Sequence, residues 1–188
     1  MSELHLYKNM RLLTSGIDAC IEKKLNTPAL ILIYSTIDTT GWLDSSEEFA
    51  TKDSFMNWVD DYLLKAKPLQ CTPLDLYAAR CGLLHTFTPA SQLSSSGKAR
   101  RIYYAWGTAS VQDLQRTIDF TNKSKKYVAV HVNDLYEALQ LGLIRFSEEL
   151  EKDPDRKVMI YKKADKFFDD FSLEAMSDVL TVINDKGV

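Results

Sequence analysis

Apolar residues recur every three or four positions through most of the first half of the chain, the spacing of amphipathic helices. The predicted helices cover residues 3–25, residues 28–40, a stretch that ends before Pro68, and a stretch from Pro73 to a point before Pro89. Asn26-Thr27 and Thr72 are expected to cap the second and fourth helices, and Gly41 to end the second. The second helix is apolar on most sides, so we expect it to be the most buried.

The second half adds two β-branched and aromatic runs, residues 102–106 and 127–132. These runs predict strands, which we expect to pair as a hairpin whose connection holds a short helix over residues 110–121. Before them, Thr88–Lys98 is rich in serine and predicts a mobile loop. A long helix capped by Asn133 should follow and stop at Asp153-Pro154. The last predicted elements are a helix from Pro154 with Val158, Tyr161, Ala164 and Phe168 on one face, and a further helical turn or two within Ser172–Ile183.

These elements predict a mainly α fold, a helical bundle with a small β-hairpin insertion. At 188 residues, of which 45% are hydrophobic, the chain suits one well-buried domain better than two. The core helices would span about 3–88, the loop and β excursion about 89–132, and the C-terminal helices about 133–183.

Composition narrows the class of protein. A net charge of −3 argues against a generic DNA-binding protein, so any contact with nucleic acid must be local. The N-terminus lacks a signal-peptide pattern and no apolar run is long enough to span a bilayer, so we expect a cytoplasmic protein without membrane contact. The three cysteines show no CxxC spacing and the three histidines form no ligand pair. Neither a disulfide framework, a metal site nor a cofactor is expected.

Two polar features stand out in the apolar helices. Asp38 lies near the end of the second helix, where a carboxylate is either hydrogen-bonded for structure or turned toward a functional cleft. Arg80 and His85 lie about 140° apart around the fourth helix, yet the long arginine side chain can reach a cleft near the imidazole. In the structural alternative, Arg80 pairs with Asp38 or Asp75 and His85 satisfies the helix C-terminus. Gly82 between them predicts close packing by another helix or a second subunit.

The stretch Arg80-Cys81-Gly82-Leu83-Leu84-His85, with Tyr77 one turn before it, resembles the Rx4-6H motif of the HEPN superfamily (higher eukaryotes and prokaryotes nucleotide-binding). The resemblance extends to the order of helices over residues 3–88. It implies an all-helical domain, and many members of the superfamily are metal-independent ribonucleases that act as dimers. Active members commonly carry a polar residue directly after the arginine. This chain has Cys81 there, and a thiol is only a weak hydrogen-bond donor.

RNA cleavage without a metal needs a base near the 2′-hydroxyl, an acid near the leaving 5′-oxygen and positive charge at the phosphate. The resemblance implies a homodimer in which two copies of Arg80 and His85 share one cleft. His85 would be the general acid or base, and Arg80 would bind the phosphate and stabilise its transition-state charge. Lys98, Arg100 and Arg101 are either further contacts to RNA phosphates or a solvated basic turn. Six other lysines are interpreted as solvated faces: Lys123, Lys125, Lys126, Lys162, Lys163 and Lys166.

Two other functions stay open. The chain is alternatively a catalytically inactive HEPN-like module that binds a nucleotide, RNA or a protein partner. Either form would suit a toxin–antitoxin or phage-defence system with an antitoxin-like partner. The third interpretation is a plain helical interaction protein with Trp42, Trp58 and Trp106 partly at a subunit interface. Other enzyme classes have little support, because the phosphate-binding, dinucleotide-binding and nucleophile-elbow motifs are absent.

Overall fold

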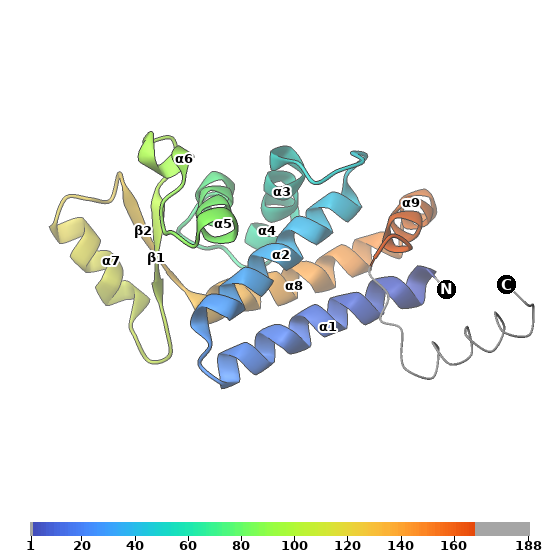
Figure 1. Cartoon of the computed structure of the whole chain (residues 1–188), viewed down its shortest axis with the longest axis horizontal. Helices are drawn as coiled ribbons and strands as arrows, with labels where there is room; N and C mark the ends of the chain where they lie inside the picture. The colour runs from blue at the N-terminus through green and yellow to red at the C-terminus, as the bar shows by residue number, and fades with distance from the viewer. Residues whose placement is uncertain (1, 168–188) are drawn as a thin grey trace, which may run out of the picture.

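The computed structural model describes residues 2–167 and is mainly α with a small two-stranded sheet, which confirms the predicted fold class (Figure 1). The helical segments are α1 (Ser2–Glu22), α2 (Asn26–Asp44), α3 (Lys52–Trp58), η1 (Val59–Leu63), α4 (Leu64–Ala66), α5 (Pro73–Thr86), α6 (Gln92–Ser95), α7 (Val111–Phe120), α8 (Val132–Leu150) and α9 (Pro154–Ala164). The strands are β1 (Arg101–Ala105) and β2 (Tyr127–His131). The expected helical turns within Ser172–Ile183, and Phe168 before them, lie outside the described residues.

The long helices α1, α2 and α8 form the body of the molecule, with the sheet and α7 at one end and α9 at the other (Figure 1). As predicted, α2 is central: it packs against α1, α3, α5, α8 and α9. Its predicted boundaries were less accurate. Asn26 belongs to the helix and no side chain caps its start. Gly41 does not end it, since the helix continues to Asp44. The missing Cβ of Gly41 instead lets the backbone of Ser54 approach, because a Cβ there would lie 2.6 Å from the Ser54 oxygen.

The third predicted helix is a continuous helical stretch through α3, η1 and α4. The apolar positions that predict this helix at a spacing of three or four residues are all buried: Phe55, Trp58, Val59, Tyr62 and Leu63. Trp58, at 1% exposed, therefore belongs to the core rather than to an interface. The middle of this stretch, η1, has π-helical geometry, in which the turn is wider than in an α-helix. Gly142 of α8 allows close contact there, because a Cβ would lie 3.2 Å from the Leu63 Cα.

The predicted hairpin was wrong: β1 and β2 are parallel, with Arg101 opposite Tyr127 and Ala105 opposite His131. The strands are parallel because the connection between them contains the helix α7. It carries the chain back along the sheet so that β2 starts beside the start of β1, whereas a hairpin needs a tight turn. The predicted serine loop contains a turn of helix, α6, whose capping box is formed by Ser91 and Ser94.

Two details of the C-terminal helices also differ from prediction. The cap of α8 is His131 and not Asn133, because His131 Nδ1 accepts the backbone N–H of Asn133 at 3.1 Å. On α9, Val158 is 69% exposed, and the buried positions are Ile160 and Ala164. Side chains from the helical segments α1 to α5, from α8 and α9 and from both strands nevertheless join one hydrophobic core. None of the helices between residues 2 and 167 combines the length and hydropathy needed to cross a lipid bilayer.

Candidate functional site

Helix α5 starts and ends through local chemistry that the sequence encodes. Thr72 caps the helix and Pro73 occupies its first turn, as predicted, and Asp75 completes a reciprocal capping box with Thr72. The helix ends where Phe87 adopts a left-handed conformation, with φ at 55°. These boundaries place Arg80 and His85 in the C-terminal half of α5.

The structure brings Arg80, Asp38 and His85 together. Arg80 Nε donates a hydrogen bond to Asp38 Oδ2 at 2.6 Å, and Arg80 Nη1 lies 3.0 Å from His85 Nε2. A guanidinium can only donate, so in this contact His85 Nε2 is the acceptor and the imidazole carries its proton on Nδ1. Arg80 therefore holds a carboxylate with one nitrogen and the candidate base with another.

Burial shapes the electrostatics of the Arg80–Asp38 pair. The side chains of Arg80 and Asp38 are 19% and 15% exposed. Burial raises the pKa of the Asp38 carboxyl, although the hydrogen bond and charge of Arg80 oppose this effect. Burial alone would lower the pKa of Arg80, but the hydrogen bond and charge of Asp38 raise it overall. The guanidinium thus stays charged beside an exposed imidazole.

Tyr77 and Cys81, the proposed supporting residues, adjoin Arg80. The Arg80 guanidinium carbon lies 6.0 Å from the centroid of the Tyr77 ring, which packs edge-on against buried Phe55 at 5.5 Å. Burial, and then the neighbouring Cys81 thiol, raise the pKa of Tyr77. Tyr77 therefore supports the guanidinium from the side of the core.

Gly82 marks a close approach, but the partner was mispredicted. A Cβ on Gly82 would lie 2.6 Å from the Thr88 oxygen and 3.0 Å from the Ala90 oxygen. The chain folds back onto α5 directly after the helix ends, and the Thr88 N–H bonds the Gly82 carbonyl at 3.2 Å. The segment that requires the glycine is therefore this chain's own backbone, not another helix or a second subunit.

The predicted basic cluster is not part of the Arg80–His85 site. Arg100 was predicted to contact RNA or to lie in a solvated basic turn. Instead, its Nε and Nη2 donate to Asp75 Oδ2 at 3.0 and 2.7 Å and its backbone N–H donates to Oδ1 at 2.6 Å. It thereby neutralises a carboxylate that is 3% exposed. Asp75 lies ten residues before His85, about 15 Å along the helix axis. Lys98 is exposed, and the Arg101 guanidinium carbon lies 5.8 Å from the centroid of the Tyr127 ring.

A cavity of about 320 Å³ opens beside the site and reaches Asp38. It is lined chiefly by Thr39, Trp42, Phe49 and Lys166, whereas Arg80 and His85 do not line it. Asp38 therefore has one side toward Arg80 and borders a partly apolar hollow large enough for a small molecular group.

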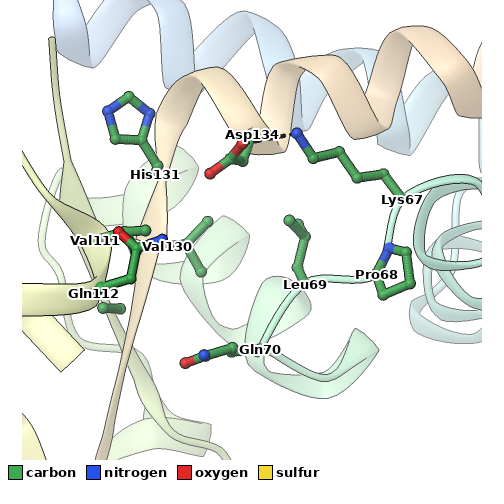
Figure 2. A pocket seen from close by; sticks show the side chains of 10 residues that line it. Lys67, Pro68, Leu69, Gln70, Val111, Gln112, Val130, His131 and Asp134 are labelled. Carbon is green, nitrogen blue, oxygen red and sulfur yellow. Dashed lines mark hydrogen bonds and ion pairs between the residues drawn. The ribbon is translucent and has the colours of Figure 1, made fainter. Parts of the chain in front are cut away.

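Sequence reasoning missed a second cavity, of about 170 Å³, which is lined by the C-terminal end of β2, the start of α7 and residues 67–70 (Figure 2). Recognising the helix between the strands as a crossover would have pointed to it. Figure 2 shows Lys67 reaching Asp134 across this cavity, and their charged atoms are 2.7 Å apart. The His131 nitrogens face the Asn133 N–H and the Gly107 carbonyl. The charged side chains of this cavity, Lys67 and Asp134, and the imidazole of His131 are thus already bound to other groups of the protein.

Comparison with known proteins gave no relative. The chain matches no protein-family model, no curated protein and no solved structure. Within residues 2–167, no three His, Cys, Asp or Glu side chains are grouped so that they could hold a metal ion. The Arg80–His85 contact is therefore the feature of the molecule that best indicates a chemistry.

Proposed function

We propose that the chain is a metal-independent endoribonuclease of the HEPN type, with Arg80 and His85 as catalytic residues. The observation that carries the proposal is the 3.0 Å contact between Arg80 Nη1 and His85 Nε2, in which a charged phosphate-binding group lies beside a proton-transfer group. Arg80 retains further N–H donors, because a guanidinium has five and these contacts use two.

The reaction follows from these groups. The 2′-hydroxyl oxygen of RNA attacks phosphorus while the bond to the 5′-oxygen breaks, and the products are a 2′,3′-cyclic phosphate and a 5′-hydroxyl. His85 Nε2 takes the proton of the 2′-hydroxyl when it acts as base, and a protonated imidazole gives a proton to the 5′-oxygen. Arg80 neutralises the charge that develops on the equatorial phosphate oxygens.

One imidazole cannot be base and acid in the same step, so the proposal includes a homodimer. The exposure of His85 near the end of α5 supports it, because a two-fold axis near this helix end can bring two imidazoles to one phosphate. Asp38 is then a positioning residue for Arg80, with Tyr77, Cys81 and Gly82 as supporting residues. Lys98 and Arg101 are proposed contacts to neighbouring RNA phosphates. A cytoplasmic toxin–antitoxin or phage-defence system with an antitoxin-like partner is the proposed context.

The direct test is incubation of the purified chain with mixed RNA in excess EDTA. Wild type should produce fragments with cyclic-phosphate and 5′-hydroxyl ends, and Arg80→Ala and His85→Ala should lower the rate by about 10²-fold or more. Arg11→Ala, which removes an exposed arginine from α1, is the matched control. Equal cleavage by all four proteins would trace the activity to a contaminant. A strictly monomeric state by light scattering at high concentration would refute the shared site.

A second candidate is a catalytically inactive module that binds a nucleotide, RNA or a protein partner. Two observations favour it: His85 Nε2, the atom needed as base, is engaged by Arg80, and Cys81 occupies the position that is commonly polar in active members. Saturable RNA or nucleotide binding without turnover, abolished in Arg80→Ala, would support this function over the nuclease.

A further inference from the structure

Basic side chains surround the point where β1 and β2 begin, at the end of the sheet opposite the cavity in Figure 2. They come from the segment before β1 and from the turn between α7 and β2: Lys98, Arg101, Lys123, Lys125 and Lys126. The Arg101 N–H bonds the Lys126 carbonyl at 2.8 Å, which joins the two segments. No acidic side chain of the described chain forms an ion pair with any of the five. A local excess of positive charge therefore exists on a chain whose net charge is −3.

A cavity of about 230 Å³ lies within this basic region. Arg101 and Lys126 line it together with the serines of α6, Ser94 and Ser95. The Nε of Arg101 is buried and has no hydrogen-bond acceptor within the described chain. The guanidinium of Arg101 lines the cavity and forms no ion pair within the described chain, so it can donate hydrogen bonds to an anionic oxygen bound there.

Aromatic rings adjoin the same basic region. The rings of Tyr103 and Tyr127 are stacked, with centroids 4.8 Å apart and planes at 13°. Tyr103 is 40% exposed, although it lies in a strand, and Tyr127 also lines the cavity. A stacked aromatic pair beside unpaired cations offers a platform for a nucleobase next to a site for its phosphate.

We propose that this region is a binding site for single-stranded RNA. Arg101 and Lys126 hold one backbone phosphate in the cavity, Tyr103 stacks a base, and Lys98, Lys123 and Lys125 contact flanking phosphates. Several unpaired cations spread over two segments suit a polyanionic strand better than an isolated phosphate. The choice of RNA over DNA rests on the proposed function. The site itself lies in the β region, outside the α2–α5 contact that positions Arg80.

The test is fluorescence anisotropy of the full chain with a short labelled RNA whose 2′-hydroxyls are methylated, so that it cannot be cleaved. Arg101→Gln, and the double variant Lys98→Gln with Lys126→Gln, should each weaken binding by about tenfold. The slope of log affinity against log salt should fall by about one for each phosphate that the variant no longer binds. Tyr103→Ala should weaken binding about tenfold with little change in that slope. Lys162→Gln, an exposed lysine on α9, is the control and should bind as wild type.

Unchanged affinity in Arg101→Gln and in the double lysine variant would overturn the inference. So would an equal loss in Lys162→Gln. The lysines are exposed and unpaired, so the double variant keeps the test valid if Arg101→Gln does not fold. If RNA binding depends on these residues and no cleavage occurs, the proposed nuclease fails and this site stands. If cleavage depends on Arg80 while the Arg101 and lysine variants bind and cleave normally, this site fails and the nuclease stands.

Discussion

Asp38 of α2 accepts the Nε hydrogen of Arg80 of α5 at 2.6 Å, and this bond sets the direction in which the guanidinium presents its remaining donors. Both side chains are largely buried, so the geometry is better defined than in a solvated ion pair. The bond also leaves Nη1 free to contact His85. The packing of α2 against α5 therefore positions the Arg80 guanidinium through its bond to Asp38.

Replacing Arg80 by lysine should show whether catalysis needs only a positive charge at this position or also the planar shape of the guanidinium. An ammonium on a shorter stem keeps the positive charge but cannot hold Asp38, His85 and a phosphate in the planar pattern of a guanidinium. We expect Arg80→Lys to lower kcat on RNA by about 10²-fold, with a smaller change in KM. Steady-state kinetics with a defined RNA would measure both. Wild-type kcat in Arg80→Lys would show that the guanidinium geometry is not needed.

The raised pKa of Asp38 predicts a pH effect on stability. Its ordinary value is 3.8, and burial raises it in the folded chain, so above about pH 4 the folded state binds more protons at this group than the unfolded state does. This contribution to stability is therefore lost as pH rises through the folded pKa. In Asp38→Asn the titration is absent, so the stability of the variant relative to wild type should improve as the pH rises above about 4. Urea unfolding across this range would test it, and a constant difference would contradict it.

We expect Arg100 to stabilise the fold rather than to bind RNA. Arg100→Ala leaves the carboxylate of Asp75, which is 3% exposed, without its cation, and we expect a loss of about 3 kcal/mol in the free energy of unfolding. Arg116→Ala is the matched control, because Arg116 and Asp113 form a pair in which the side chains are 80% and 70% exposed. That change should cost less than about 0.5 kcal/mol. If Arg100→Ala left the stability unchanged and weakened RNA binding, the result would show that Arg100 contacts RNA instead of stabilising the fold.

Local signals in the sequence predicted the fold well where neighbours along the chain decide the structure. The Thr72–Asp75 capping box and the apolar face of the third helix are of this kind, and both are present. The direction of β2 depends on where α7 leads the chain, and the residue that caps α8 depends on the rotamer of His131. Neither the direction of β2 nor the cap of α8 can be predicted from residue types alone, because both depend on the three-dimensional course of the chain.

The candidate site was predictable only as a set of alternatives. Sequence periodicity left both Asp38 and Asp75 as acids for Arg80, since Asp38 lies on a helix that could face Arg80 and Asp75 lies five residues before it on the same helix. Packing decided between them: Asp38 binds Arg80, and Asp75 binds Arg100. The Arg80–Asp38 pair of the structural alternative is present, and the same arginine also contacts His85.

The buried hydroxyls of Tyr34 and Tyr104 should behave as a unit. They hydrogen-bond to each other and link α2 to β1. Burial raises the pKa of both hydroxyls, so they stay neutral. Tyr34→Phe or Tyr104→Phe alone should cost about 1–3 kcal/mol, because each leaves a buried hydroxyl without its partner, and the double variant should cost less than the sum. A double-mutant cycle by urea unfolding measures this, and strict additivity would show that the two hydroxyls are not coupled.

Alanine substitutions at Gly82 and Gly16 should act in opposite directions, although both glycines lie inside helices. Alanine gains about 1 kcal/mol of helix propensity at either position. At Gly82 the new Cβ would lie 2.6 Å from the Thr88 backbone oxygen, which cannot move without shifting the segment that follows α5. At Gly16 it would lie 3.3 Å from the end of the flexible Leu32 side chain. We expect Gly82→Ala to destabilise the fold by about 1–3 kcal/mol, since overpacking outweighs propensity, and Gly16→Ala to stabilise it by about 0.5 kcal/mol. A stabilising Gly82→Ala in urea unfolding would mean that the chain does not fold back onto α5 as closely as described.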